Sequence, residues 1–335
     1  MPDLKPLEEK NWSVKDFNYA VPAHAKSFGY SVGGITVVGF MLLILSGVIM
    51  ALFFTPTVDG ARQSVLNMIS SPWGMWLRSF HRWLAETVSF LIILHISRII
   101  FTGSYAGKRK WNWMFGIGLL IITFAFFFSG TAIKWDQEGY EAYGHSIESF
   151  ELVPVVGGAL AAFFKGGLAA MRLFATHTLI LPILLFVCLV PHLVLMKLNG
   201  LSPIPGKTST KTIMFYDHVT KIIGFSAAIF GLVAFLAAQY PVSLYAGPYS
   251  GTEITKPPWI FFPLYQFEDW FGVIALVIFP IIVLIGLILL PFIDKNVENI
   301  KTRRVVVWSY LLLVTIMILF IINIAVLPPV KHLGG

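Results

Sequence analysis

Seven stretches of the chain are apolar almost throughout, and each is long enough to cross a hydrocarbon layer, which takes about 20 residues. The segments between them are polar and carry most of the charge. Apolar runs of this length, separated by charged connections, predict seven membrane-spanning helices and an all-α, polytopic membrane protein. The predicted spans are 31–55, 80–102, 112–133, 173–198, 217–239, 271–291 and 305–327.

Composition supports this class, because 57% of the 335 residues are hydrophobic and 12% are charged. Residues 153–170 form one more apolar stretch, but four glycines and Lys165 interrupt it. We therefore expect surface or interfacial structure there rather than an eighth span. The choice matters, since with seven spans the second and fourth predicted helices run parallel, whereas an eighth span would make them antiparallel.

Basic residues gather in alternate connections, near 108–110, 197–211 and 295–304, and in the N-terminal segment, while the opposite connections are acidic. The positive-inside rule places the basic connections and the N-terminus in the cytoplasm. The net charge of +7 then reflects topology and does not indicate binding to nucleic acid. Because residues 1–28 lack an apolar core, we expect segment 1–30 to lie on the cytoplasmic surface rather than to be a cleavable signal peptide.

Four histidines lie as two pairs within two of the predicted spans. Their spacings are 14 residues for His81 and His95 and 15 residues for His177 and His192. Such steps return to nearly the same helix face about 21 to 22 Å further along the axis, so each helix offers one imidazole near each side of the membrane. Two helices facing each other would form two bis-histidine sites, which is what two non-covalent b-type haems require. The pairs are His81 with His177 and His95 with His192.

Glycines repeat this spacing in two flanking spans, where Gly33 and Gly47 lie 14 residues apart, as do Gly116 and Gly130. They would let a flat macrocycle approach the backbone. Cations nearby at membrane-interface depth could neutralise haem propionates, or could anchor the helices at the interface. These cations are Arg78, Arg82 and Arg98.

Cys188 is the only cysteine and lies in the middle of a predicted span, where we expect it to pack. A single cysteine allows no disulfide, no iron–sulfur ligand set and no C-x-x-C-H haem attachment.

Around these histidines the sequence resembles cytochrome b of the quinol-oxidising cytochrome bc complexes over nearly its whole length. Residues 78–83 are R-S-F-H-R-W, residues 135–137 are W-D-Q, and residues 172–177 are R-L-F-A-T-H. Residues 257–263 are P-P-W-I-F-F-P, similar to the family's P-E-W-Y-F-F-P at the outer quinol-oxidation pocket.

The 15-residue spacing of the second histidine pair resembles that of the chloroplast-type form of the family. In that form, the four-helix haem part and the three-helix subunit IV are separate chains. The resemblance implies that the two are fused here. It implies a surface segment 1–30, a four-helix di-haem domain 31–200, a cytoplasmic linker 201–216 and a three-helix domain 217–335.

The outer pocket departs from the family's pattern at Pro258, which replaces the glutamate taken to accept a quinol proton. Ile260 replaces the motif tyrosine, and Lys134 replaces the proline before Trp-Asp-Gln. Proton acceptance at the motif itself is therefore impossible, and a nearby carboxylate could substitute if it is not simply solvated in a loop. The carboxylates considered are Asp136, Glu138, Glu268 and Asp269, and the full set of candidate catalytic residues is Trp135, Asp136, Pro258, Trp259 and Glu268.

Ser31 stands where chloroplast-type members have a cysteine that holds an additional haem, so no third haem can be tethered there. The resemblance also implies a quinone pocket on the cytoplasmic side, beside the His95/His192 site. Protonatable groups there could relay protons from the cytoplasm, although each alone is also an ordinary loop or helix-end residue. The candidates are Ser31, Lys26, Lys197, Asp217, His218 and Lys221.

The expected function is that of a di-haem subunit of a quinol-oxidising complex in a bacterial or archaeal cytoplasmic membrane. The resemblance implies two b-type haems, quinone and quinol, a Rieske-type iron–sulfur partner, a c-type cytochrome or other acceptor, and a homodimeric assembly. In one alternative, the protein binds both haems but only conducts electrons between a partner and the quinone pool. Pro258 favours this alternative. A haem-free proton or ion transporter or scaffold subunit is an alternative of another class. A quinone-reducing anchor such as those of formate dehydrogenases would explain neither the paired glycines nor residues 259–263.

Overall fold

The computed structural model describes residues 18–202, 211–248, 255–295 and 300–329. Within these residues seven helices are long and apolar enough to span a membrane, which confirms the predicted number and the all-α membrane class. Residues 1–17 of the predicted surface segment and residues 203–210 of the predicted linker lie outside this description.

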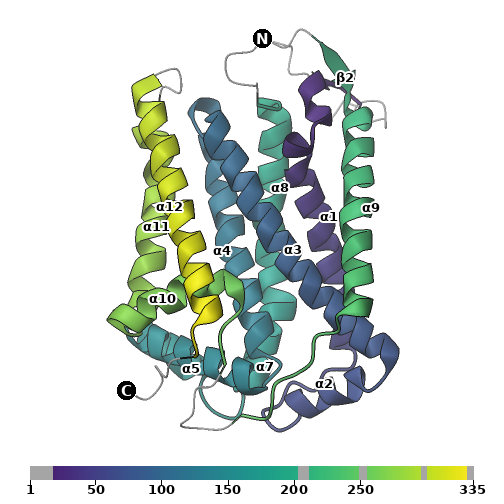
Figure 1. Ribbon diagram of the computed structural model, residues 1–335, viewed down its shortest axis with the longest axis vertical. Coiled ribbons are helices and arrows are strands. Elements are labelled where there is room, and N and C mark those ends of the chain that lie inside the picture. Colours follow the sequence, from purple (N-terminus) through teal and green to yellow (C-terminus); the bar gives the residue numbers. More distant parts are fainter. Residues whose placement is uncertain (1–17, 203–210, 249–254, 296–299, 330–335) are drawn as a thin grey trace, which may run out of the picture.

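Four of the long helices form a bundle, which Figure 1 shows at the centre of the molecule. They are α1 (Phe28–Ala51), α3 (Pro72–Thr102), α4 (Lys110–Ala132) and α8 (Leu181–Asn199), the last continuing from α7 (Ala169–Ala175) through the π-helical turn η5 (Thr176–Ile180). Helix α1 packs along α3, and α4 packs along α8. Helix α9 (Phe215–Gln239) covers α1 and α3. Apolar residues from all five helices share one core, with Ile35, Leu84 and Leu185 fully buried.

Helix α3 begins eight residues before the predicted span 80–102. The Ser71 hydroxyl caps it by accepting the Gly74 N–H at 3.0 Å, and Pro72 occupies the first turn. It ends at Gly103, which has a left-handed φ of 66°. Because backbone hydrogen bonding continues past the apolar stretch, the polar turn with Arg78 belongs to the same rigid helix as the histidines.

The two ends of the bundle carry different structures (Figure 1). One end has the short helices α2 (Ala61–Ile69), α5 (Gln137–Glu151), α6 (Gly157–Phe164) and α10 (Phe262–Phe271), with the turn η6 (Trp259–Phe261). The other end has the antiparallel strands β1 (Ala20–Pro22) and β2 (Thr212–Met214), with the turns η3 (Ala23–Lys26) and η4 (Gly107–Arg109). At eight residues α6 is about 12 Å long, too short to cross a membrane, and no spanning helix lies in the described residues 153–168.

Helices α11 (Ile274–Ile293) and α12 (Ile300–Val326) attach to one side of the bundle. The Tyr105 hydroxyl, at the end of α3, donates to the Asp294 carboxylate at the end of α11, and Arg303 of α12 donates to the same hydroxyl at 2.7 Å. Burial and the neighbouring Asp294 raise the pKa of the Tyr105 phenol, so it stays protonated as a donor. The Trp113 indole of α4 adds a 2.8 Å bond to the Leu287 carbonyl. Polar contacts therefore fix the C-terminal helices against the bundle.

Candidate functional site

Each of the four histidines of the sequence pattern faces one of the four glycines on a neighbouring helix. A Cβ atom would lie 2.8 Å from the His95 ring at Gly33, 3.3 Å from His81 at Gly47, 3.4 Å from His192 at Gly116 and 3.0 Å from His177 at Gly130. The contacts at Gly33, Gly47 and Gly130 are too tight for a larger side chain unless the ring moves, whereas the contact at Gly116 is an ordinary van der Waals distance. The glycines therefore allow each imidazole to lie against the adjacent helix backbone.

Two of the imidazoles are held in one tautomer by hydroxyl groups. Nδ1 of His81 lies 2.8 Å from Ser46 Oγ, and Nδ1 of His177 lies 2.9 Å from Ser129 Oγ. Both hydroxyls already donate to backbone carbonyls of their own helices, so each oxygen accepts the Nδ1–H of the ring. Nε2 then carries the lone pair, which is the arrangement that a metal-ligating histidine needs.

On the other side of the bundle, His192 donates its Nδ1–H to the Asn112 carbonyl at 2.9 Å. The facing ring, His95, has a buried Nδ1 with no hydrogen-bond partner among the described residues. The two rings are close enough to interact electrostatically. Ser46, Ser129 and Asn112 were missed from the sequence, because their positions follow no spacing rule until the helices are packed.

A cavity of about 430 Å³ lies inside the bundle and brings His81 and His177 together, as the seven-span topology predicts. Gly47 and Gly130 also line it, and His177 enters from η5. A π-helical turn of this kind often occurs at a functional site. Two imidazoles with Nε2 lone pairs, in a cavity whose walls lack side chains at the glycines, could hold a haem iron between them.

Basic side chains line the same cavity near His81. Arg78 donates to the Val242 carbonyl, and Nε of Arg82 lies 2.9 Å from Oε1 of Glu86. Lys134 also lines this cavity, which its position in the motif did not suggest. Arg98 lies outside this cavity, where its Nη1 donates to Ser202 Oγ at 2.8 Å.

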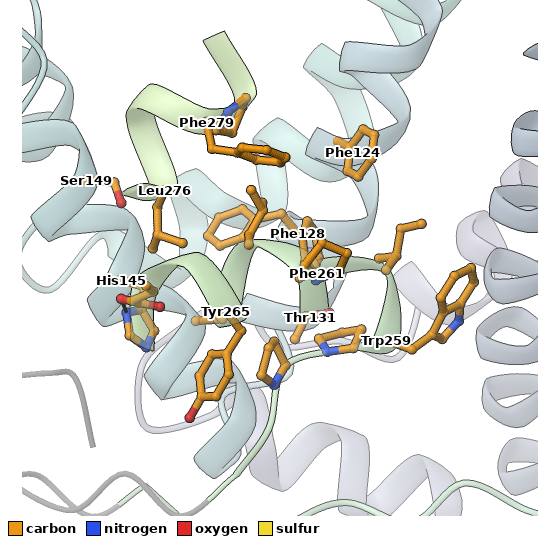
Figure 2. Close-up of a pocket in the computed structure, with 18 of the residues that line it drawn as sticks. Phe124, Phe128, Thr131, His145, Ser149, Trp259, Phe261, Tyr265, Leu276 and Phe279 are labelled. Atoms are coloured by element: carbon orange, nitrogen blue, oxygen red, sulfur yellow. Dashed lines mark ion pairs between the residues drawn. The ribbon is translucent and has the colours of Figure 1, made fainter. Parts of the chain in front are cut away.

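A second cavity, of about 670 Å³, lies between α4, α5, α10, α11 and α12 (Figure 2). Phe124 and Phe128 of α4, Trp259 and Phe261 of η6, and Phe279 of α11 form an aromatic lining. Pro258 faces this cavity too, so the P-P-W-I-F-F-P segment contributes directly to its wall. A mostly apolar cavity with a few polar groups is typical of a small-molecule site.

The polar groups of this cavity come mainly from one face of α5. Glu138, Glu141 and His145 follow each other at helical spacing, and Glu268 of α10 joins them. Nδ1 of His145 lies 2.9 Å from Oε1 of Glu268. The carboxylate predicted at Glu268 is therefore at the cavity, whereas Glu141 and His145 were missed because only packing shows which face of α5 is turned inward.

Other predicted residues lie behind the wall of this cavity. Asp136 is fully buried and caps α5 by accepting the Gly139 N–H at 3.0 Å, and its carboxylate also accepts from Lys134. Trp135 is buried in an apolar cluster, and its ring lies tilted against that of Tyr143, with the ring centroids 5.1 Å apart. Neither residue lines either cavity. Asp269 does not line the large cavity and lies within hydrogen-bonding distance, 3.4 Å, of Gln266.

Glu86 was not selected from the sequence, yet it lies between the two cavities. Its carboxylate accepts from Arg82 of the smaller cavity and from the indole of Trp259, which lines the larger one. Its second oxygen is buried without a hydrogen-bond partner among the described residues.

The candidates for a cytoplasmic-side pocket are dispersed at the opposite end. Ser31 is buried and donates to the Ser27 carbonyl at 3.1 Å, and buried His218 bonds to the Ala25 backbone, so these two lie near the same turn. Lys197 lies over the Tyr19 ring. Lys26, Asp217 and Lys221 are exposed.

The amino-terminal part of the chain establishes the family. Residues 17–200 match the family model described as Cytochrome b/b6/petB. The chain belongs to the cytochrome b family. Cytochrome b6 of Gracilaria tenuistipitata var. liui is 33% identical over 54% of this chain and 87% of its own length. Cytochrome b6 of Heliobacterium mobile is 31% identical over 55% of this chain and 89% of the relative's length. Cytochrome b6 of Synechococcus elongatus is 33% identical over 54% of this chain and 87% of the relative's length.

The fold of a solved structure extends the likeness beyond these relatives. A chain of a hyperthermophilic respiratory Complex III superposes with a TM-score of 0.76 at 22% identity, covering 93% of this chain and 87% of that one. The fold thus includes the three helices that follow the part shared with the cytochrome b6 chains. Membership of the cytochrome b family implies haem b binding and a role in membrane electron transfer, in agreement with the four inward-facing imidazoles.

Proposed function

We propose that this member of the cytochrome b family is the di-haem subunit of a quinol-oxidising membrane complex. The observation that carries the proposal is the set of four imidazoles, each seated against a glycine, three with Nδ1 bonded so that Nε2 is left to bind iron. His81 and His177 would hold one haem, and His95 and His192 the other. When bound, each haem would carry one electron at a time and, with both axial positions filled, would offer no open position to oxygen.

The arginines serve these haem sites. Arg78 and Arg82 line the His81/His177 cavity and are placed to neutralise propionate groups there. Arg98, one turn beyond His95, would neutralise propionate groups at the His95/His192 site. Ser202 and the Tyr30 ring orient its guanidinium.

The 670 Å³ cavity is the proposed outer quinol-oxidation site. Pro258 and Trp259 shape its wall, and Glu268 supplies a carboxylate inside it. Asp136 and Trp135 position this wall from behind, because Asp136 caps the helix that carries Glu138, Glu141 and His145. Oxidation of a quinol there releases two electrons and two protons, one electron passing to a partner acceptor and the other toward the His81/His177 site.

At the opposite end, the proposed quinone-reduction site lies beside His95 and His192. Ser31 and His218 are its buried polar residues, and Lys197, Asp217 and Lys221 would deliver protons from the cytoplasm. The distribution of basic residues supports a cytoplasmic N-terminus in the inner membrane. The proposed partners are a Rieske-type iron–sulfur protein and a c-type cytochrome or equivalent acceptor, within a homodimeric complex.

In a second candidate function, the protein binds both haems but does not send the two electrons of quinol along separate routes. Pro258 favours it, because a proline in the cavity wall cannot accept a proton. The chain would then conduct electrons between a partner protein and the quinone pool.

The test uses the purified complex with its partners. The complex is oxidised, the cytoplasmic-side quinone pocket is blocked with an inhibitor, decylubiquinol or a short-chain menaquinol is added, and b-haem absorbance is followed as oxidant is pulsed in. Extra haem reduction caused by the oxidant is the expected result. Haem that dithionite reduces but the oxidant pulse does not, with a competent acceptor, would indicate the electron conduit. Absence of b-haem absorbance would refute both and favour the haem-free transporter or scaffold.

A further inference from the structure

The outer cavity needs a proton acceptor that the sequence motif does not provide. If quinol is oxidised there, as the proposed function holds, its hydroxyl protons must pass to groups that reach the cavity. Pro258, Trp259 and Phe261 supply no basic group on the motif segment. The acceptor must therefore come from elsewhere in the wall.

Two of the carboxylates in the wall are engaged in structural contacts. Glu138 forms an ion pair with Lys134 that is buried between α4 and α5. Glu141 accepts the Gln137 side-chain N–H at 2.7 Å and the Thr255 N–H at 3.2 Å, and it also accepts the Thr255 hydroxyl. Both carboxylates are therefore already occupied by donors that hold the wall of the cavity together.

The pair His145 and Glu268 has a different character. The side chain of Glu268 is 1% exposed and that of His145 is 14% exposed, and Oε1 and Nδ1 lie 2.9 Å apart. A buried carboxylate facing Nδ1 of an imidazole favours the Nδ1–H tautomer and stabilises the imidazolium that forms when the ring gains a proton. The same carboxylate–imidazole logic operates in catalytic triads.

The pair also has the right position. His145 lies on α5 and Glu268 on α10, the helix that directly follows η6 and its Trp259, so the pair joins the two walls of the cavity. Figure 2 shows His145 at one end of the cavity, with Tyr265 and Leu276 nearby and the aromatic residues beyond.

We propose that His145 and Glu268 act as one unit that accepts a hydroxyl proton from quinol bound in the outer cavity, in place of the glutamate missing at Pro258. In this step a quinol O–H bond breaks and an N–H bond forms on the imidazole, whose charge the Glu268 carboxylate balances. The electrons leave separately, to the one-electron acceptors of the proposed function. The proton then passes from the pair to the aqueous side.

Other ionisable groups near the pair would influence its titration. Glu138 and Glu141 line the cavity from α5, Tyr265 lines it from α10, and Asp269 follows Glu268. Lys134 reaches Glu138 from the end of α4. Helix α11 contributes no ionisable residue, and the basic residues of α12 lie at its opposite end.

The test compares Glu268→Gln, His145→Gln and the conservative Glu268→Asp in the complete complex, with Glu151→Gln as the matched control. Glu151 is at the end of α5 but pairs with Lys165 on the surface, outside the cavity. The rate of oxidant-induced b-haem reduction is measured against pH, with decylubiquinol or a short-chain menaquinol as the donor. General acid–base groups contribute about 10²- to 10⁴-fold, so both Gln variants should lose at least about 100-fold in kcat, with little change in KM.

Three further results distinguish proton transfer from a structural role. The Gln variants should lose the pH dependence seen in the parent complex, Glu268→Asp should restore part of the rate, and an infrared carboxylate band that changes on quinol oxidation should disappear in Glu268→Gln. Dithionite-reduced b-haem spectra should be unchanged, showing that each variant is folded.

The inference is overturned if the parent complex oxidises quinol and both Gln variants keep its rate and pH profile. It is also overturned if Glu86→Gln, at the haem side of Trp259, removes the pH dependence while the pair's variants retain it. A parent complex without oxidant-induced haem reduction would instead show that the proposed function itself is wrong, and the inference with it.

Discussion

The four-helix bundle and the three C-terminal helices place their chemistry differently. In the bundle, histidines and glycines lie within the membrane-spanning helices, and the two histidine sites lie about 21 Å apart along the same pair of helices. In the C-terminal part, α11 has no ionisable residue, and the carboxylate that this part contributes to the large cavity, Glu268, lies in α10, between the spans. A site within regular helices is encoded by periodicity, whereas a site built from connections depends on how the helices pack.

Replacing one of the four bundle histidines should have the largest effect, because it should separate the two regions by their haem content. His177→Ala should eliminate half of the b-type haem, because a single imidazole cannot hold the iron on both sides. Haem per polypeptide, measured as the pyridine haemochrome, and a redox titration check this. His145→Ala, which changes the one histidine among the described residues that lines the large cavity, should retain the full haem content. Equal haem content in both variants would contradict the assignment of histidines to the two regions.

Replacing a glycine that contacts a histidine ring should have the second-largest effect on haem content. Gly33→Ala would place a Cβ 2.8 Å from the His95 ring, so it should lower haem occupancy on that side. Gly224→Ala on α9 has no atom within 4 Å of the new Cβ. It should be neutral or stabilising by up to about 1 kcal/mol, the helix-propensity difference between the two residues. Haem content and thermal stability of both variants are the measurements, and unchanged haem in Gly33→Ala would disprove the tight fit.

The junction between the two regions is tested by Tyr105→Phe. The change leaves the buried Asp294 carboxylate and Arg303 without the phenol between them. Loss of a partner for a buried polar group costs about 1 to 3 kcal/mol, so Tm should fall while the b-haem spectrum is preserved. Tyr240→Phe, at an exposed residue, is the control. If the two variants have the same Tm, this polar contact does not hold the C-terminal helices to the bundle.

The smallest predicted effect concerns the hydroxyl behind one imidazole. Ser46→Ala removes the acceptor of the His81 Nδ1–H, and loss of such a partner weakens metal binding by about 10-fold. The midpoint potential of the affected haem should also shift. Ser226→Ala provides the control, since its buried hydroxyl has no hydrogen-bond partner among the described residues. Identical potentials and haem retention in the two variants would show that Ser46 does not orient the ring.

Much of the fold was predictable because lipid imposes a minimum length and hydrophobicity on every span. The seven helices, the parallel direction of α3 and α8 and the meeting of His81 with His177 follow from that constraint. Helix ends were less predictable, since α3 extends into polar sequence as far as its Ser71 cap. The inward face of α5 was not predictable either, because a short amphipathic connection can turn any polar residue toward solvent or toward a cavity.

The resemblance to the cytochrome b family implied that a proton acceptor is missing at Pro258. By itself, the sequence predicted the number of spans and the histidines that could bind iron. These depend on composition, helical periodicity and side-chain chemistry, which are local properties of the chain. Only the tertiary structure decided that Ser46, Ser129 and Asn112 hold three of the imidazoles, that Glu86 lies between the two cavities, and that His145 meets Glu268. These contacts join residues far apart in the chain, and their partners are fixed by helix packing, which no local pattern specifies.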